Sequence, residues 1–371
     1  MSTTQRRQKI AIIGPSHPYK GGIVMETTEL AHQLSSDGAD VTLCSWRSQY
    51  PSLLYPGSQF TATEKPERPL FSNTIRTLAW YNPLSWWRLG RRLRTFDQII
   101  FIWWLPTIQG PIYLTIGAAL GRSHAERIVL CHNVLPHEGK PGDRAVTRLM
   151  LKHIDRVLVH TPAQAAIASE LTNKPIATAS LPLALPGTVP TKPLTNRPLK
   201  HQLLYFGIVR PYKGLDVLLH AIAELPDVHL VVAGEFWGGS ELYTDLIEKL
   251  AIANQVTIHT GYASDYELAD YFAACDALVL PYRNGTASQN VGIGHAFGVP
   301  VIATTAGSMA EHIRPGVDGL VCEPNSVTSL VSTITDFYAP GTAKRLQAGI
   351  PRITTAGGWQ TYLTALVGSD K

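Results

Sequence analysis

The sequence is poor in charged residues. Asp, Glu, Lys and Arg make up 16% of the 371 residues and hydrophobic residues make up 45%, whereas average soluble domains are roughly 25% charged. This balance suits sheets that helices cover on both faces. The formal net charge of +4 is small for this length, so nucleic acid is not an expected partner.

Cysteine is scarce as well. The four cysteines stand at positions 44, 131, 275 and 322 and form no Cys-x-x-Cys pair. Neither a disulfide framework nor a zinc site is therefore indicated. We expect reduced, buried thiols.

The chain also lacks an unbroken hydrophobic run of membrane-spanning length. Its most apolar region, residues 99–120, contains Pro106, Gln109, Gly110 and Pro111. Because these residues interrupt a spanning helix, the region predicts a buried strand, a turn and a helix. Residues 1–9 contain no apolar signal region and lead directly into a strand-like stretch. A cytoplasmic location is the resulting expectation.

What is present is a repeated alternation of strand-like and helix-like segments. At 371 residues, the chain exceeds what one hydrophobic core usually organises, which predicts two domains. Short apolar runs of strand length alternate with helical spacing in both halves, which predicts an α/β fold of two doubly wound parallel sheets. The runs cover 9–14, 39–45, 98–104, 127–131 and 157–160, then 203–207, 229–234, 256–261, 277–281 and 300–304.

A proline-rich stretch separates the two series. Residues 181–198 contain five prolines and show no usable period, so we place the interdomain linker there. The N-terminal domain is then predicted over residues 1–188 and the C-terminal domain over residues 199–345.

The tetrapeptide Pro-Tyr-Lys-Gly follows the first strand of both halves, at 18–21 and 211–214. Open α/β sheets bind ligands beyond the carboxyl ends of their strands, so both copies lie where a ligand is expected. Arg210 and Lys213 also precede a predicted helix over 215–223. A pyrophosphate suits such a place, because a guanidinium, an ammonium and free backbone N–H groups all face it. The alternative is a solvated basic loop, but the flanking glycines and the strand end favour a site.

An ordered set of motifs in the second half resembles the group 1 retaining glycosyltransferases, family GT4. The set comprises Gly207 to Asp216, Val232-Ala-Gly234-Glu235, Gly261-Tyr262, Cys275 to Pro281, Gly298-Val-Pro300 to Ala303, and Gly307 to Glu311. The first half resembles the family through Gly21-Gly22 and Cys131-His132-Asn133. The resemblance implies a GT-B fold, two Rossmann-like domains that face a cleft. It also implies a nucleotide-sugar donor, no obligatory metal, and a final helix within residues 346–371 that crosses back towards the N-terminal domain.

The resemblance also implies roles for single residues. Arg210 and Lys213 would hold the donor diphosphate, while Gly21 and Gly22 would let backbone N–H groups approach it or the acceptor. The alternative for the two glycines is an ordinary turn. His132 is similar to the family's histidine near the transferred sugar and is the catalytic candidate. The alternative for His132 is a packed histidine without a catalytic role. Further phosphate candidates are Ser288, Gln289, Asn290 and Val291, and the candidates near the base or ribose are Gly261, Tyr262, Glu235 and Asn290.

The sequence departs from the family at two positions. Most relatives carry two glutamates separated by seven residues, and Gly285 and Ile293 stand in their places. Ribose recognition must then come from elsewhere, and the amides of Gln289 and Asn290 can both donate and accept hydrogen bonds.

The leading hypothesis is a glycosyltransferase that moves a sugar from a nucleotide-diphosphate donor to a hydroxyl with retention, the acceptor being a sugar, a lipid-linked or a small molecule. The alternative is a non-catalytic GT-B protein that binds nucleotide-sugars or acts as a scaffold. A nicotinamide oxidoreductase is a third class, but its Gly-x-Gly-x-x-Gly fingerprint is absent after the first strand of either half.

The segment 86–94 combines aromatic and cationic residues at the spacing of a basic amphipathic helix. One interpretation is peripheral contact with the inner face of a membrane, through Trp86, Trp87, Arg88, Arg91 and Arg92. The other is a helix that packs its Trp and Leu side chains on the core while the arginines remain solvated.

Overall fold

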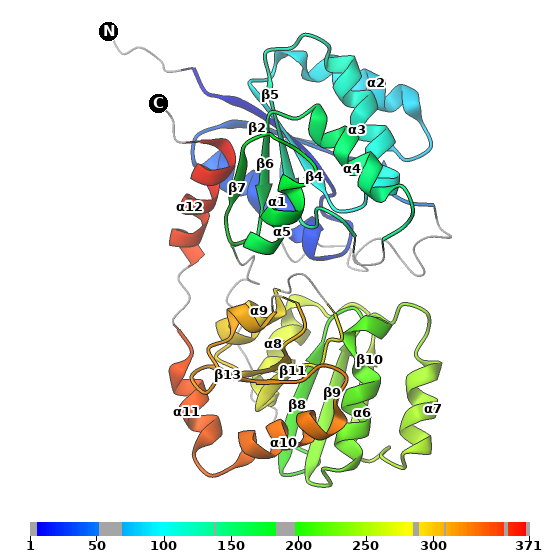
Figure 1. Cartoon of the computed structure of the whole chain (residues 1–371), viewed down its shortest axis with the longest axis vertical. Coiled ribbons are helices and arrows are strands. Elements are labelled where there is room, and N and C mark those ends of the chain that lie inside the picture. The colour runs from blue at the N-terminus through cyan, green and yellow to red at the C-terminus, as the bar shows by residue number, and fades with distance from the viewer. Residues whose placement is uncertain are drawn as a thin grey trace. The chain divides into compact units, whose positions relative to one another are not determined.

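The computed structural model describes residues 6–51, 69–136, 139–182, 197–284, 289–307, 309–351 and 355–368. The chain divides into two compact units (Figure 1). The first comprises Met1–Ala184 together with Thr354–Lys371, and the second comprises Leu185–Ile353.

The first unit is built on a parallel sheet with the strand order β3-β2-β1-β4-β5-β6-β7. Its strands are β1 (Lys9–Ile13), β2 (Asp40–Ser48), β3 (Thr74–Ala79), β4 (Gln98–Trp103), β5 (Glu126–Cys131), β6 (Arg156–Val159) and β7 (Ile176–Thr178). Its helices are α1 (Gly22–Ser36), α2 (Pro83–Arg92), α3 (Pro106–Leu120), α4 (Asp143–Lys152), α5 (Pro162–Ser169) and α12 (Thr355–Val367).

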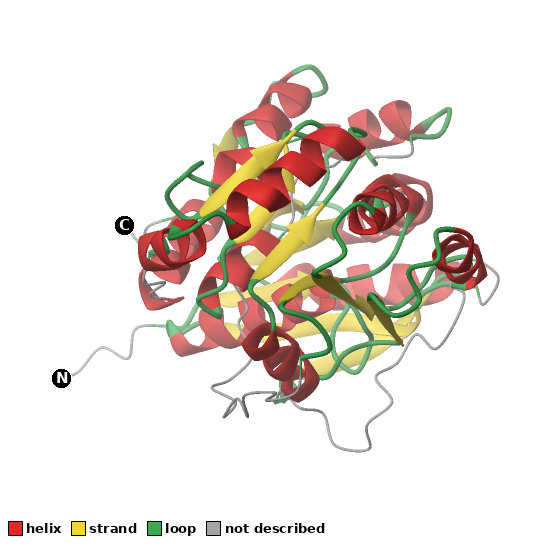
Figure 2. Ribbon diagram, turned by 90° about the horizontal axis from the view of Figure 1, so that it is seen from below, coloured by secondary structure: helices red, strands yellow, loops and turns green. Residues whose placement is uncertain are grey.

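Alternate residues of these strands belong to two cores. Ala11 and Ile13 pack with residues of α2, α3 and α4, whereas Ile10 and Ile12 pack with residues of α1 and α12. Figure 2 shows helices on both sides of the strands. The strands are buried on both faces, which explains why they are nearly continuous apolar runs in the sequence.

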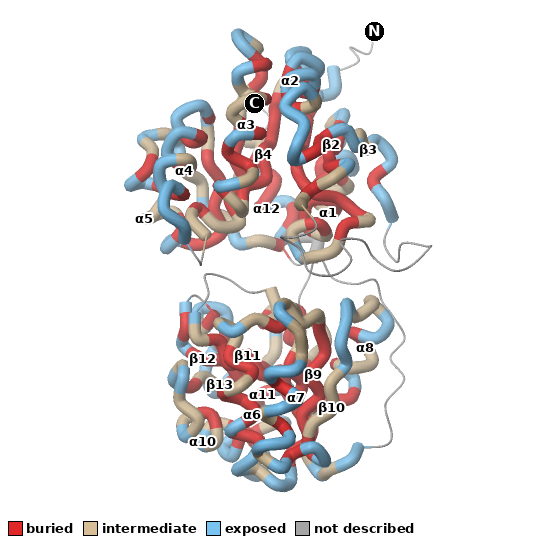
Figure 3. Tube along the Cα trace, turned by 90° about the vertical axis from the view of Figure 1, so that its right-hand side faces the viewer, coloured by how far each residue is buried: buried red, intermediate tan, exposed pale blue. Residues whose placement is uncertain are grey.

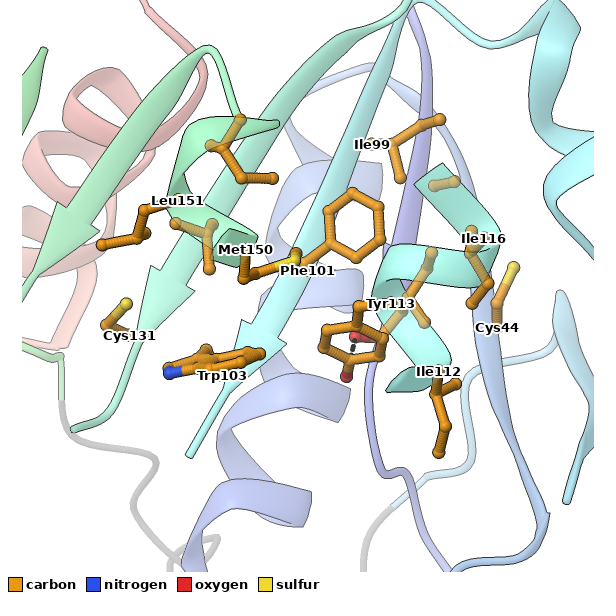
Figure 4. Close-up of a cluster of buried hydrophobic side chains, with 14 of the residues drawn as sticks. Cys44, Ile99, Phe101, Trp103, Ile112, Tyr113, Ile116, Cys131, Met150 and Leu151 are labelled. Atoms are coloured by element: carbon orange, nitrogen blue, oxygen red, sulfur yellow. Dashed lines mark hydrogen bonds between the residues drawn. The ribbon is translucent and has the colours of Figure 1, made fainter. Parts of the chain in front are cut away.

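Figure 4 shows the first of these cores, where Tyr113 of α3 lies near Phe101 and Trp103 of β4. The ring centroids are 5.2 Å apart for Phe101 and Tyr113 and 6.2 Å apart for Trp103 and Tyr113. The Tyr113 hydroxyl donates to the carbonyl oxygen of Ile102 at 2.9 Å, so this buried polar group is satisfied. Burial raises the pKa of this hydroxyl.

The second unit contains a parallel sheet with the order β10-β9-β8-β11-β12-β13. Its strands are β8 (His201–Phe206), β9 (Val228–Gly234), β10 (Val256–Thr260), β11 (Ala277–Leu280), β12 (Val301–Thr304) and β13 (Gly319–Cys322). Its helices are α6 (Leu215–Ala223), α7 (Glu241–Lys249), α8 (Asp265–Ala274), α9 (Asn290–Ala296), α10 (Val327–Tyr338) and α11 (Thr342–Gly349), with short 3-10 turns η3 (Pro211–Lys213) and η4 (Met309–His312).

Local sequence fixes several of these elements. Ser264 and Glu267 form a capping box that starts α8, and the Ser326 side chain accepts from Ser329 N at the start of α10. Figure 3 shows the strands buried along most of their length, while the outer sides of many helices are exposed.

Both sheets have the doubly wound order, in which the first strand pairs with the second on one side and with the fourth on the other. The order reverses between β1 and β4 in the first unit and between β8 and β11 in the second. The predicted fold class, two doubly wound parallel sheets of the Rossmann type, is confirmed.

The apolar region 99–120 forms most of β4, a turn and α3, as its breakers predict. Within the described part of the chain, every helix is too short or too polar for a transmembrane segment. All four cysteines are buried and free. Burial raises the pKa of Cys44 and of Cys275 to about 12 and that of Cys322 to about 11, so these thiols are unreactive near neutral pH.

Candidate functional site

The predicted phosphate loop lies where the strand order of the second unit reverses. Residues 207–214 follow β8, and residues 281–284 follow its neighbour β11. Ligands of open α/β sheets bind at this place, beyond the carboxyl ends of the two strands that flank the reversal.

Lys213 and Asn290 converge on the backbone of Gly207. Gly207 has φ +116°, and a Cβ added there would lie 3.2 Å from Asn290 Nδ2 and 3.4 Å from Lys213 Nζ. Asn290 Nδ2 also donates to the carbonyl oxygen of Phe206 at 2.9 Å, which fixes the amide beside the strand end. Asn290 Nδ2 donates to the Tyr282 hydroxyl as well, at 3.3 Å, so the amide is a fixed neighbour of the Lys213 ammonium, and the ammonium is the group that suits an anion.

Aromatic rings hold both cations of the loop. The Arg210 guanidinium lies 4.9 Å from the ring centroid of Trp237 and 5.7 Å from that of Tyr212, and Lys213 Nζ lies 5.3 Å from that of Tyr282. Cation–π contacts restrict such long side chains without neutralising their charge.

Arg283, which the sequence analysis missed, ties the loop to β11. Its Nη1 donates to the Pro211 carbonyl oxygen at 2.7 Å, and its backbone N donates to Tyr212 O at 2.7 Å. The guanidinium also donates to both carboxylate oxygens of Asp216, and its Nε donates to Asn325 Oδ1 at 2.7 Å. Partial burial alone would raise the pKa of Asp216, but Arg283 outweighs this effect and holds it below its usual value.

Gly214 lets the loop approach β11 closely. It has φ +68°, and an added Cβ would lie 2.0 Å from the carbonyl oxygen of Pro281. A side chain here would clash with backbone that cannot move without the strand, so only glycine fits.

The other candidates of the second unit occupy neighbouring strand ends. Glu235 follows β9, is half-buried, and accepts from Val209 N through its backbone oxygen at 2.8 Å. Gly261 and the exposed Tyr262 follow β10, which pairs with β9 rather than β8. These residues therefore lie one and two strands away from the loop after β8.

The start of α9 contains the remaining candidates. Gln289 is its N-cap residue, and Val291 is buried within it, so only the backbone of Val291 is available to a ligand. Ile293, which the family resemblance places at a glutamate position, is buried in the same helix. Ser288 and Gly285 lie outside the described residues.

In the first unit, Gly21 and Gly22 stand at the start of α1. Gly21 is the N-cap residue with φ +114°, a conformation that L side chains rarely adopt, and an added Cβ would meet no atom within 4 Å. The glycine is therefore required by the backbone conformation rather than by lack of space.

His132 follows β5 and contacts a carboxyl group that the sequence analysis did not single out. Its Nδ1 lies 3.0 Å from Glu26 Oε2 on α1, and both side chains are buried. Burial raises the pKa of Glu26 well above its usual value, and burial together with nearby His160 lowers the pKa of His132 well below its usual value. The His160 ring lies 5.2 Å from that of His132 and stacks on Tyr362 of α12 at 5.9 Å.

The basic segment forms α2 and divides into two sides. Trp86 is buried, and its Nε1 donates to the carbonyl oxygen of Ala79 at 2.7 Å. The prediction that Trp86 lies on a contact surface is therefore wrong, because its indole belongs to the core. Trp87 is 45% exposed. Arg88, Arg91 and Arg92 are exposed on the same helix.

Residues 192–352 match the family model described as Glycosyl transferases group 1. They cover nearly all of the second unit and include the whole loop after β8. The second unit is a group 1 glycosyl transferase domain. This match covers less than half of the chain and agrees with the resemblance that its motifs predict.

Curated relatives match this chain over a length similar to that of the family match. A D-inositol 3-phosphate glycosyltransferase of Mycolicibacterium gilvum is 28% identical over 174 residues, which is 46% of this chain and 39% of that protein. One of the same name from Thermobispora bispora is 30% identical over 177 residues, 44% of this chain and 41% of that protein. The chain thus spans about two fifths of the length of these relatives.

Solved structures resemble the whole chain. A sucrose-phosphate synthase of Thermosynechococcus elongatus has a TM-score of 0.74 at 17% identity, with 97% of both chains covered. HepE of Anabaena in complex with UDP and glucose has a TM-score of 0.72 at 15% identity, with 98% of this chain and 100% of that chain covered. At such identities the likeness shows the fold, and with the group 1 domain it identifies the fold as GT-B.

Proposed function

We propose that this protein transfers a sugar from a nucleotide-diphosphate donor to an acceptor hydroxyl. The observation that carries the proposal is the convergence of Lys213 Nζ and Asn290 Nδ2 on Gly207 at the reversal point of a group 1 domain. Arg210 adds a second cation on the same loop.

The chemistry of this loop suits a diphosphate better than a neutral ligand. Two full positive charges come from one short loop, and a phosphate accepts from a guanidinium, an ammonium and backbone N–H groups alike. The Arg283 contacts with Pro211, Tyr212 and Asp216 fix the loop before a ligand arrives, which reduces the ordering cost of binding.

A uridine nucleotide is the first donor to test. HepE, which shares the fold, was solved with UDP, with UDP and glucose, and with UDP-glucose. Gly261 and Tyr262 after β10 and Glu235 after β9 are proposed to line the base or ribose. Asn290 and Gln289 would supply polar contacts in place of the glutamates that relatives carry.

For the transfer step we propose that His132 of the first unit acts at the sugar, with Gly21 and Gly22 admitting the phosphate or the acceptor to the backbone. Retention of anomeric configuration is part of the proposal and rests on the family resemblance. NMR of the product decides it, because an inverted anomer would contradict the proposed mechanism.

The experiment measures binding and transfer in parallel. Calorimetric titration with UDP-, GDP- and ADP-sugars identifies the donor, and transfer or hydrolysis of that donor is then assayed. We expect Arg210→Ala and Lys213→Ala to weaken binding at least about tenfold each, since hydrogen bonds to charged groups contribute about 1.5–3 kcal/mol. Lys344→Ala and Arg345→Ala, which remove exposed cations of α11 in the same unit, are the matched controls.

A specific observation favours one competitor, a GT-B protein that binds nucleotide-sugars without turnover. Ile293, which the family resemblance places at a carboxylate position, is buried, so the described site has no acid at that position. Tight binding of a nucleotide-sugar without product from any acceptor, and without hydrolysis, would support this second candidate.

We further propose that the exposed side of α2 contacts an anionic membrane. Leu84 and Trp87 of α2 are 52% and 45% exposed, and Tyr81, which precedes the helix, is 60% exposed. The neighbouring Arg88, Arg91 and Arg92 are exposed and positively charged. Apolar side chains beside cations on one helix fit the headgroup region of anionic lipids.

A further inference from the structure

Two ionisable side chains of the first unit are buried against each other. Glu26 belongs to α1, which follows β1, and His132 stands directly after β5. Glu26 Oε2 and His132 Nδ1 are 3.0 Å apart, and the two side chains are 8% and 9% exposed. Neither takes part in another ion pair within the described parts of the chain.

Two further titratable side chains lie near the pair among the described residues. They are His160, at the end of β6, and Tyr362 on α12. His160 Nδ1 lies 3.3 Å from the carbonyl oxygen of Ala179, which can only accept, so this nitrogen carries the hydrogen. Burial lowers the pKa of His160 to about 4, which leaves its ring neutral at pH 7.

A count of protons limits the states of the pair. Burial opposes a net charge, as the raised pKa of Glu26 and the lowered pKa of His132 express. The two arrangements without net charge are a carboxylic acid beside a neutral imidazole and a carboxylate beside an imidazolium. The 3.0 Å separation of Oε2 and Nδ1 is the observation from which we place one proton between these two atoms. With that proton held there, the hydrogen of the ring stands on the second nitrogen of His132, Nε2.

We propose that Glu26 is the positioning residue of His132: its carboxyl group occupies Nδ1 and fixes the imidazole in the form whose Nε2 bears the hydrogen. His132 then meets its ligand as a hydrogen-bond donor rather than as a base. The ligand group must be an acceptor, such as a hydroxyl oxygen of the donor sugar. This inference rests on the proposed function for the identity of the ligand, but not for the state of the ring.

Stability alone is a weak reason for the pair. Burying two ionisable groups costs desolvation, and well-packed apolar residues of similar volume are often as stable or more so. In contrast, the partner of one histidine nitrogen determines whether the other nitrogen carries a hydrogen. Glu26 can therefore affect the ligand through His132 without contacting the ligand itself.

The first test is the tautomer itself, which requires neither donor nor turnover. Nitrogen-15 NMR of histidine-labelled protein, with His132 assigned through His132→Asn, reports which ring nitrogen carries the hydrogen. We expect Nε2–H in the whole protein at pH 7. A ring protonated on Nδ1 alone, with a bare Nε2, would overturn the proposal even if the protein proved an active transferase.

The second test compares variants of Glu26. In Glu26→Gln the amide N–H donates to Nδ1 and preserves the Nε2–H form, so we expect kcat within about threefold of the wild type. Glu26→Leu leaves Nδ1 without a partner, and we expect kcat to fall at least about tenfold with an unchanged Kd for the nucleotide. Glu29→Gln on the same helix, whose partner is Gln33, is the control.

The outcomes separate the two proposals. Equal losses in Glu26→Gln and Glu26→Leu, or no loss in either, would contradict the positioning role while leaving the transferase proposal intact. If no donor supports turnover, the tautomer and the shift of His132 Nε2 on addition of UDP-glucose still decide the inference, because neither depends on catalysis. Thermal unfolding of each variant shows whether a loss comes from misfolding.

Discussion

Arg283 binds Asp216 with two nitrogens of its guanidinium group: Nη1 lies 2.7 Å from Oδ1, and Nη2 donates to Oδ2. The same guanidinium donates to the Pro211 carbonyl oxygen. One side chain after β11 thus joins the loop that carries Lys213 to the helix that follows it.

From this contact we expect Arg283→Lys to weaken nucleotide binding by about tenfold, because lysine keeps the charge but cannot reproduce the planar fork. Asp216→Asn should weaken it less, and the double variant should not add the two losses, since both remove one contact. Calorimetric titration with the donor nucleotide measures this. Arg314→Lys, which alters the pair of Arg314 with Asp318 elsewhere in the unit, should leave the affinity unchanged. If the affinity losses of the two single variants add in the double variant, Arg283 affects nucleotide binding through something other than its contact with Asp216.

Gly214→Ala should destabilise the second unit by about 2–4 kcal/mol, since it adds backbone strain to a Cβ placed 2.0 Å from Pro281 O. Gly341→Ala is the matched control, because Gly341 has φ +82° and open space around an added Cβ. It should cost only about 1 kcal/mol. Urea unfolding of both variants measures the difference, and equal losses would mean that the loop moves freely away from β11.

The buried His160 predicts loss of stability in acid. Its pKa is about 4 in the folded protein against about 6.5 in an unfolded chain. Because the pKa is lower in the folded protein, the unfolded chain binds a proton more readily. The part of the free energy of unfolding that depends on a neutral His160 is therefore fully present above pH 6.5 and is lost as the pH falls towards 4, to a total of about 3 kcal/mol. Replacing the ring by an amide in His160→Asn should flatten this part of the profile. Urea unfolding at pH 7, 6 and 5 tests it, and parallel profiles for both proteins would count against a neutral buried His160.

The α2 surface predicts salt-sensitive binding to anionic vesicles. Trp87→Ser combined with Arg88→Glu should reduce co-sedimentation with phosphatidylglycerol-containing vesicles about tenfold or more, since each surface cation contributes about 1 kcal/mol. Leu149→Ser with Arg148→Glu on α4 is the control, as Leu149 is 47% exposed and Arg148 is also exposed. Equal binding of all three proteins would remove α2 from the proposal.

The sequence predicts the interior strands well, but of the four edge strands it predicts only β10. β1, β4, β8 and β11 are buried on both faces and stand out as apolar runs, but β3, β7 and β13 lie at the edges of their sheets and were not predicted. β3 is partly exposed along its length, and β7 has three residues, so neither shows such a run. Gly22 is the first residue of helix α1, although a glycine pair indicates a turn when the backbone is not known.

For the site, loops and motifs were predictable, whereas partners across the fold were not. Arg210 and Lys213 follow a strand in a recognisable motif, and they remain the predicted phosphate contacts. Glu26 and Arg283 gain their importance only from contacts with residues far away in the chain, His132 and Asp216. No local pattern reveals such pairs. The burial of Trp86 and the exposure of Trp87 were unpredictable for a similar reason. The packing of α2 on α3 decides which of these two adjacent indoles is buried.

The last helix of the chain completes the first unit. Trp359, Tyr362, Leu363 and Leu366 of α12 pack on the face of the sheet formed by Ile10, Ile12 and their neighbours. During synthesis this face has no such cover until the ribosome has made the whole second unit and then α12. The N-terminal unit therefore cannot finish folding before its C-terminal neighbour is made, and a stop codon before α12 would leave an apolar surface open to aggregation.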